Sequence, residues 1–186
     1  MGIFEILLIA VGLSMDAFAV SVAKGISASK ISVRDALVAG IWFGGFQALM
    51  PWIGYTLGTG FSVLVSSWDH WIAWFLLTLI GGNMLREALS GDEEEKFSGS
   101  FSVRTMFPLA IATSIDALAV GVSFAFLRMD IRLPVVLIGL TTLMFSFAGV
   151  YLGRSFGSRF KSGAGIVGGL VLIGIGVKIL VEHTML

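Results

Sequence analysis

The chain has 186 residues, of which 56% are hydrophobic and only 13% are charged, and its formal net charge is zero. Soluble domains have about 45–50% apolar and about 25% charged residues, so this composition predicts an integral membrane protein, as does the mean hydropathy of +0.96. A zero net charge argues against a nucleic-acid partner. The chain contains no cysteine, which excludes disulfides, thiolate metal sites and thiol nucleophiles.

Six apolar segments are each long enough to cross a hydrocarbon core of about 30 Å as a helix, which takes about 20 residues. In chain order they are approximately Ile3–Ala23, Leu37–Gly58, Trp71–Leu89, Phe107–Leu127, Leu133–Leu152 and Gly165–Val181. None alternates polar and apolar residues as membrane strands do, so the expected fold class is all-α, a polytopic membrane protein with six transmembrane helices. The first segment lacks a positive n-region, and we expect it to be retained rather than cleaved as a signal peptide.

Basic residues favour one orientation of these six helices. Nine Lys and Arg residues fall on the face that holds the first, third and fifth loops, whereas two fall on the opposite face. Because an excess of positive charge marks the cytoplasmic side of a membrane protein, we expect both termini outside the cytoplasm. Residues 90–104, which contain the acidic run Asp92–Glu95, are then expected to form a cytoplasmic linker.

A heptapeptide occurs twice, one hundred residues apart, as Ser14–Val20 (SMDAFAV) and Ser114–Val120 (SIDALAV). The similarity continues at a shift of 95 residues, which aligns Gly44 with Gly139 and the third helix with the sixth. Three helices per half is an odd number, so the two halves enter the membrane from opposite sides. The expected organisation is two inverted-topology three-helix repeats, residues 1–89 and 105–186, separated by the linker.

Asp16 and Asp116, one in each heptapeptide, are expected near the middle of the membrane. At 1.5 Å per residue, each lies roughly 12–14 Å from the cytoplasmic edge of its helix. An ionisable group at that depth is costly, and it usually faces a partner or a water-filled cavity. We expect the two carboxylates to share one divalent cation, which would remove their mutual repulsion. The alternative is that each is protonated, or hydrogen-bonded to a helix neighbour, for packing alone.

Polar residues on other helices complete the predicted metal site. Gln47 precedes Pro51 by four residues, so the proline removes the N–H donor of the Gln47 carbonyl and leaves a backbone oxygen beside a side-chain amide. Asn83 is a further candidate ligand. For both amides the alternative is hydrogen bonding between helices. The candidate pathway residues are Ser14, Ser114, Thr142 and Lys178, and the alternative for Lys178 is that it extends to the membrane surface.

The ligands available inside the membrane are oxygens, which suit Mg²⁺, Ca²⁺ or Mn²⁺ better than copper or zinc. Several motifs then point to a family. The two aspartate heptapeptides, together with Phe43–Pro51 (FGGFQALMP) and Gly176–His183 (GVKILVEH), resemble those of the bacterial MntP-type manganese efflux pumps, which belong to a wider group with lysine-exporter-like transporters. The resemblance covers almost the whole chain. It implies export of Mn²⁺ across the inner membrane, with Asp16 and Asp116 at the family's intramembrane aspartate positions.

These observations together predict a secondary transporter that exports Mn²⁺ by alternating access of its two halves, coupled to an ion gradient. The sequence lacks a nucleotide-binding loop of the G-x-x-x-x-G-K-[ST] type, so we expect no use of ATP by this chain. We expect no enzyme activity and no bound cofactor; the partners are the transported cation and the lipid bilayer, and the oligomeric state stays open. The alternatives are a lysine-exporter-like amino-acid exporter and an intramembrane aspartyl hydrolase.

Overall fold

The computed structural model describes residues 2–28, 30–62 and 100–156, together with isolated positions in the ranges 71–86 and 166–181. The elements of this part are the helices α1 (Ile3–Ser27), α2 (Val33–Ser62), α4 (Val103–Ala112), α5 (Ile115–Phe126) and α6 (Arg132–Phe156). The all-helical prediction is therefore confirmed for the described residues. The expected third and sixth helices lie largely outside them, although each isolated position described in those two ranges is helical.

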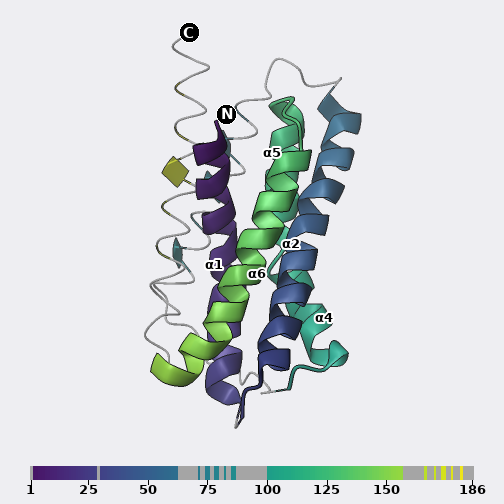
Figure 1. The fold of residues 1–186 in the computed structure, drawn as a ribbon. Coiled ribbons are helices and arrows are strands. Elements are labelled where there is room, and N and C mark those ends of the chain that lie inside the picture. The colour runs from purple at the N-terminus through teal and green to yellow at the C-terminus, as the bar shows by residue number, and fades with distance from the viewer. Residues whose placement is uncertain are drawn as a thin grey trace.

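Three of the described helices are long and apolar enough to cross a membrane, over Ile3–Ser27, Val33–Gly60 and Arg132–Ser155. The helices α4 and α5 meet this criterion only as a pair, and they join at a bend of 41°. They lie end to end, so that together they follow the length of the bundle (Figure 1). The sequence predicted one segment over Phe107–Leu127, and the structure instead has a broken helix there.

The break between α4 and α5 follows from two adjacent hydroxyl side chains. Thr113 and Ser114 each donate a hydrogen bond to the carbonyl four residues earlier, at 3.0 and 2.6 Å. Such bonds compete with the backbone N–H groups and bend helices. The repeat partner Ser14 bonds in the same way at 2.5 Å, yet α1 continues through it. Its neighbour is Leu13 rather than a second hydroxyl residue, which accounts for the difference.

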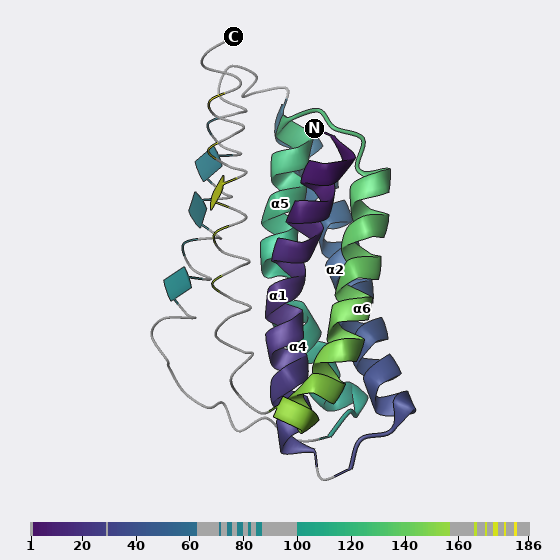
Figure 2. The same ribbon diagram turned by 60° about the vertical axis from the view of Figure 1, so that its left-hand side comes forward.

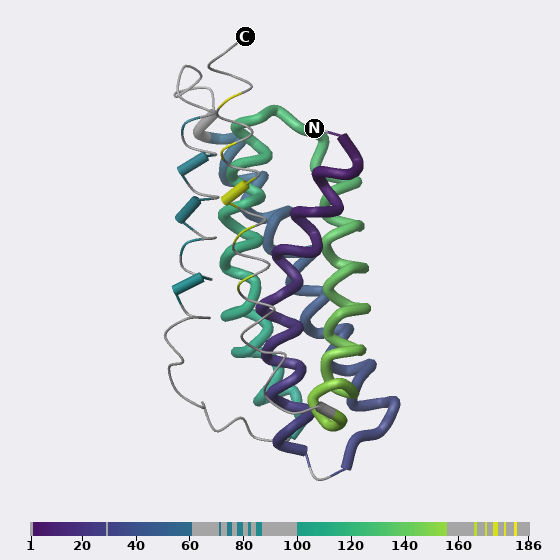
Figure 3. The backbone as a smooth tube through the Cα atoms, turned by 90° about the vertical axis from the view of Figure 1, so that its left-hand side faces the viewer, coloured from purple at the N-terminus to yellow at the C-terminus, as the bar shows by residue number. Residues whose placement is uncertain are grey.

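The helices pack in an order that brings the two halves of the chain together. The helix α1 packs mainly against α6, and α2 packs against both α6 and α5. Figure 2 shows α1 and α6 running in the same direction, from the end that holds the N-terminus to the opposite end. The tube view has α5 on one side of α1 and α6 on the other (Figure 3).

A close contact between α2 and α6 lies at the centre of this arrangement. A Cβ added at Gly44 would lie 2.7 Å from the carbonyl oxygen of Gly139, and a Cβ added at Gly139 would lie 3.2 Å from the carbonyl oxygen of Gly44. Only residues without a side chain permit such an approach, as in other membrane helix pairs. The two backbones therefore touch directly at this level.

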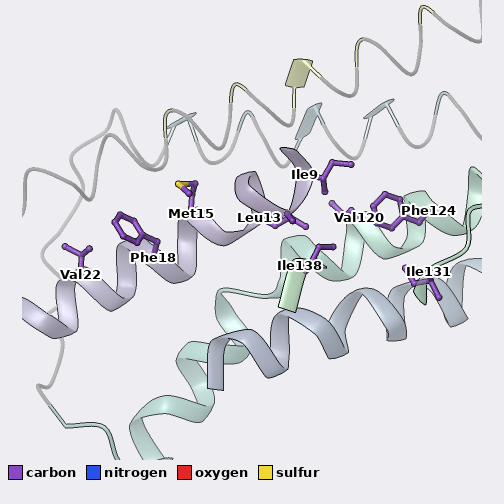
Figure 4. Packing of buried hydrophobic residues seen from close by; sticks show 11 residues of the cluster. Ile9, Leu13, Met15, Phe18, Val22, Val120, Phe124, Ile131 and Ile138 are labelled. Atoms are coloured by element: carbon purple, nitrogen blue, oxygen red, sulfur yellow. The ribbon is translucent and has the colours of Figure 1, made fainter. Parts of the chain in front are cut away.

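The larger of the two apolar clusters in the described part of the chain surrounds the middle of α1. Ile9 and Leu13 of α1 gather there with Val120 and Phe124 of α5 and with Ile138 of α6 (Figure 4). All five side chains are almost completely buried. The cluster thus joins side chains of the two helices that carry the heptapeptides with those of α6.

Lys24 is fully buried in the last turns of α1, although it is one of the nine basic residues that the sequence analysis assigned to the cytoplasmic face. Its Nζ donates a hydrogen bond to the carbonyl oxygen of Ser100 at 2.7 Å and lies 5.1 Å from the centre of the Phe101 ring. A buried ammonium requires such partners. The contact ties the end of α1 to the segment that leads into α4.

Candidate cation site

Asp116 lies in the first turn of α5, directly after the helix break. Its Oδ1 accepts a hydrogen bond from the backbone N–H of Ala117 at 2.8 Å. Its Oδ2 is buried and accepts no hydrogen bond of regular geometry from the residues that the structure describes, although the side chain of Gln47 lies beside the carboxylate. The first turn of a helix carries a partial positive charge, so the break places this carboxylate where a negative charge is stabilised.

Asp16 lies in the middle of the unbroken α1, and its side chain is half-buried, as is that of Asp116. The two carboxylates are close enough to interact electrostatically. The structure therefore brings together two aspartates that stand one hundred residues apart in the sequence. Their role as ligands of a shared cation stays a prediction.

Gln47 connects α2 to the other two helices of the site. Its Nε2 donates a hydrogen bond to the carbonyl oxygen of Leu13 at 2.9 Å, and its buried Oε1 has no hydrogen-bond partner among the described residues. The helix runs on through Pro51, which has no N–H to give to the Gln47 carbonyl. Buried oxygens without donors are unusual. The side-chain amide thus lies beside Asp116, ties α2 to α1, and has an oxygen without a donor among the described residues.

The remaining predicted residues fall into three groups. Ser14 and Thr142 are fully buried and lie 3.0 Å apart, oxygen to oxygen, so they join α1 to α6. Ser114 instead donates to the carbonyls of Ala110 and Ile111 in the last turn of α4, at 2.6 and 3.1 Å. Asn83 and Lys178 lie outside the described residues, so their roles stay predictions.

Ser21 and Ser146, two further buried hydroxyl residues, were not among the predicted site residues. Ser21 and Ser146 are fully buried, and neither Oγ has a hydrogen-bond partner in the described part of the chain. Ser21 follows Ser14 by seven residues and Ser146 follows Thr142 by four, so each shares a helix face with a predicted pathway residue. The helical spacing could have found both, and the 95-residue shift of the repeat, which pairs Ser146 with Pro51, is a second signal for Ser146.

The described residues contain no group of three or more His, Asp or Glu side chains that could hold a metal ion. A cation at this place would therefore be held by two carboxylates and by neutral oxygens from amide, hydroxyl or carbonyl groups. Ligand sets of this kind suit hard or borderline divalent cations such as Mg²⁺, Ca²⁺ and Mn²⁺. The donors that the structure brings together fit that class of ion.

Long apolar helices around a half-buried carboxylate pair define a polytopic helical membrane protein with a polar site among its helices. A family model described as "Putative manganese efflux pump" matches residues 30–180 of the chain. The chain belongs to this family, which confirms the resemblance found in its motifs. No solved structure is significantly similar to it.

Relatives named "Putative manganese efflux pump MntP" match almost the full length of the chain. The protein of Acetivibrio thermocellus is 55% identical over 98% of this chain and 92% of its own length. That of Bifidobacterium adolescentis is 56% identical over 97% of both chains. That of Mannheimia succiniciproducens is 55% identical over 100% of this chain and 99% of its own.

Proposed function

We propose that this protein exports Mn²⁺ from the cytoplasm across the inner membrane as a secondary transporter. The observation that carries the proposal is the meeting of Asp16 and Asp116, from separate helices, inside an apolar bundle. The names of its relatives indicate manganese as the cargo. The oxygen donors around the aspartates suit that ion.

The carboxylate pair offers a simple basis for ion exchange. Two negative charges at short range in a poorly hydrated site repel each other, and a divalent cation between them removes the repulsion. When the cation leaves, protons can neutralise the same oxygens. The site would then alternate between a metal-bound and a protonated form, which would couple Mn²⁺ export to a proton gradient.

Contacts between the helices support the inverted repeat on which alternating access would rest. Gly44 and Gly139 are partners at the 95-residue shift, and they also touch each other across α2 and α6. Residues on a twofold axis contact their own symmetry partners. These two glycines would therefore mark the axis between the halves, near the middle of the membrane where such transporters bind their cargo.

A second set of contacts is repeated on both sides of that axis. Gly149 of α6 faces the carbonyl oxygen of Phe18 in α1, and Gly54 of α2 faces the carbonyl oxygen of Leu118 in α5. The two glycines stand 95 residues apart and their two partners 100 apart, which are the shifts found in the sequence. The pairs α1–α6 and α5–α2 would thus be equivalent units that rock against each other.

Cellular manganese tests the proposal. Expression of the chain in a bacterium without its own exporter should lower cell manganese, measured by mass spectrometry, and restore growth at high Mn²⁺. Asp16→Asn and Asp116→Asn should each abolish both effects. Asp130→Asn is the matched control, because Asp130 is exposed in the connection between α5 and α6. Lower cell lysine with unchanged manganese would favour the amino-acid exporter and contradict the proposal.

A further inference from the structure

The end of α5 places an arginine in a backbone conformation that favours glycine. Arg128 has a φ of 52°, and in the described part of the chain no other residue except glycine has a positive φ. Arg128 is the left-handed residue of a Schellman ending, in which the N–H of Met129 donates to the carbonyl of Phe124 at 3.1 Å. An arginine there costs stability, because its Cβ crowds the carbonyl that follows. Strain of this kind points to a use for the side chain outside the fold.

Arg128 lines an open hollow of about 520 Å³ between α2 and the connection from α5 to α6. Trp52 and Tyr55 of α2 line one side of it, and Arg128, Asp130 and Arg132 line the other. We call this place, defined by these five residues, the arginine hollow. Figure 2 shows the connection from α5 to α6 at the end of the bundle that holds the N-terminus.

The charges of the arginine hollow suit an anion. The guanidinium of Arg128 has no ion pair or hydrogen bond among the described residues. The Nε of Arg132 lies 4.0 Å from Oδ1 of Asp130, but the two side chains are 85% and 73% exposed, so this pair is weak. No other charged residue of the described chain lines the hollow, which leaves a net charge of one positive unit. Such a charge repels a divalent cation, so the arginine hollow is not a place where Mn²⁺ would rest.

The arginine hollow also lies at a level where lipid phosphates are found. Arg128 and Arg132 are the two basic residues that the sequence analysis assigned to the face opposite the cytoplasm, and both line this one hollow. Membrane proteins carry few basic residues on that face. Arg132 directly precedes the predicted span that begins at Leu133. Tryptophan and tyrosine, here Trp52 and Tyr55, are enriched at the level of the lipid head groups.

We propose that the arginine hollow binds the phosphate of an anionic phospholipid from the outer leaflet. Arginine suits this ligand, because its planar guanidinium donates two parallel hydrogen bonds to phosphate oxygens. Trp52 is 47% exposed at the same place and offers an apolar surface to the glycerol and the acyl chains. That surface favours a phosphate that carries apolar chains over the free ion. The inference does not depend on Mn²⁺ export.

Titration of the detergent-solubilised chain with lipid, followed by native mass spectrometry, tests the binding. Phosphatidylglycerol should bind more tightly than phosphatidylcholine, and Arg128→Gln and Arg132→Gln should each weaken its binding by about tenfold, the loss of one charge-assisted contact. Arg34→Gln is the matched control and should bind as the wild type does, because Arg34 is exposed in the first turn of α2, far along the helix from Trp52. Equal binding of the two lipids, or unchanged binding by both test variants, would overturn the inference. Displacement of phosphatidylglycerol by millimolar inorganic phosphate would assign the hollow to a free anion and overturn it as well.

Arg128→Gly separates a role in the fold from a role in binding. Glycine adopts the left-handed conformation without strain, so in phosphatidylcholine the thermal midpoint of this variant should rise by about 2–4 °C. Phosphatidylglycerol should raise the midpoint of the wild type, and that gain should be lost in the variant. A lower midpoint of Arg128→Gly in phosphatidylcholine would mean that the arginine serves the fold, and an undiminished gain from phosphatidylglycerol would mean that Arg128 does not hold the lipid. Either result would contradict the proposal.

Discussion

Replacement of Gly44 by alanine should destabilise the contact between α2 and α6. The added Cβ would lie 2.7 Å from the carbonyl oxygen of Gly139 and 2.9 Å from the Cβ of Leu143. Ordinary contact begins at 3.4 Å, so the helices must move apart by 3.4 minus 2.7, about 0.7 Å, or rotate to the same effect. Overpacking of a closely fitted interior costs about 1–3 kcal/mol. We expect a loss of stability of that size from a single added methyl group.

Gly45→Ala is the matched control, because it is the same change one residue further along α2 and its Cβ would meet nothing within 4 Å. Alanine favours a helix over glycine by up to about 1 kcal/mol, so this variant should be as stable as the wild type or more stable. Thermal denaturation of the purified protein in detergent, followed by size exclusion, measures both. Gly44→Ala should lower the midpoint by about 2–12 °C, on the scale usual for a chain of this length. Equal midpoints for the two variants would refute the close helix contact.

Three further variants test individual contacts. Lys24→Met removes the ammonium that donates to the Ser100 carbonyl, so the free energy of unfolding should fall by about 1–3 kcal/mol, measured as a lower thermal midpoint. Gln47→Leu removes the side-chain amide that lies beside Asp116 and should lower Mn²⁺ efflux by about tenfold or more. Thr142→Val keeps the shape of the side chain but loses the hydrogen bond between α1 and α6, which should lower stability by about 1 kcal/mol.

The outcomes that contradict these expectations are equally specific. An unchanged midpoint for Lys24→Met would mean that the end of α1 is not held by the contact with Ser100. Full efflux by Gln47→Leu would remove the amide from the ion site. If Thr142→Val is as stable as the wild type, the hydroxyl pair contributes nothing to the packing of α6. Ser123→Ala is the common control for these three variants, because it removes a buried hydroxyl that bonds within its own helix. Its stability and efflux should stay close to those of the wild type.

The aspartate pair could be predicted from the sequence, because a costly residue recurs there within a repeated heptapeptide. Repeat symmetry fixes which residues are equivalent, and the structure brings Asp16 and Asp116 within electrostatic range. The break before Asp116 could not be predicted in the same way. Hydropathy detects apolar length, whereas the break depends on where the hydroxyls of Thr113 and Ser114 place their hydrogen bonds.

Lys24 shows a second limit of the sequence analysis. The predicted first helix ended at Ala23, which left Lys24 among the charges at its cytoplasmic end. The observed helix continues to Ser27, and this brings the lysine into contact with a segment that lies 76 residues further along the chain. A count of charges near helix ends contains no information about such a distant partner.

The central claim is that one cation is held jointly by two carboxylates, one from each half of the chain. Binding of Mn²⁺ to the purified protein, followed by loss of the electron paramagnetic resonance signal of the free ion, tests it most directly. The wild-type chain should bind one Mn²⁺ with measurable affinity, and Asp16→Asn and Asp116→Asn should each remove that binding completely, whereas Asp130→Asn should leave it intact. If each of the two variants binds Mn²⁺ as the wild type does, the carboxylates do not share an ion and the account is wrong.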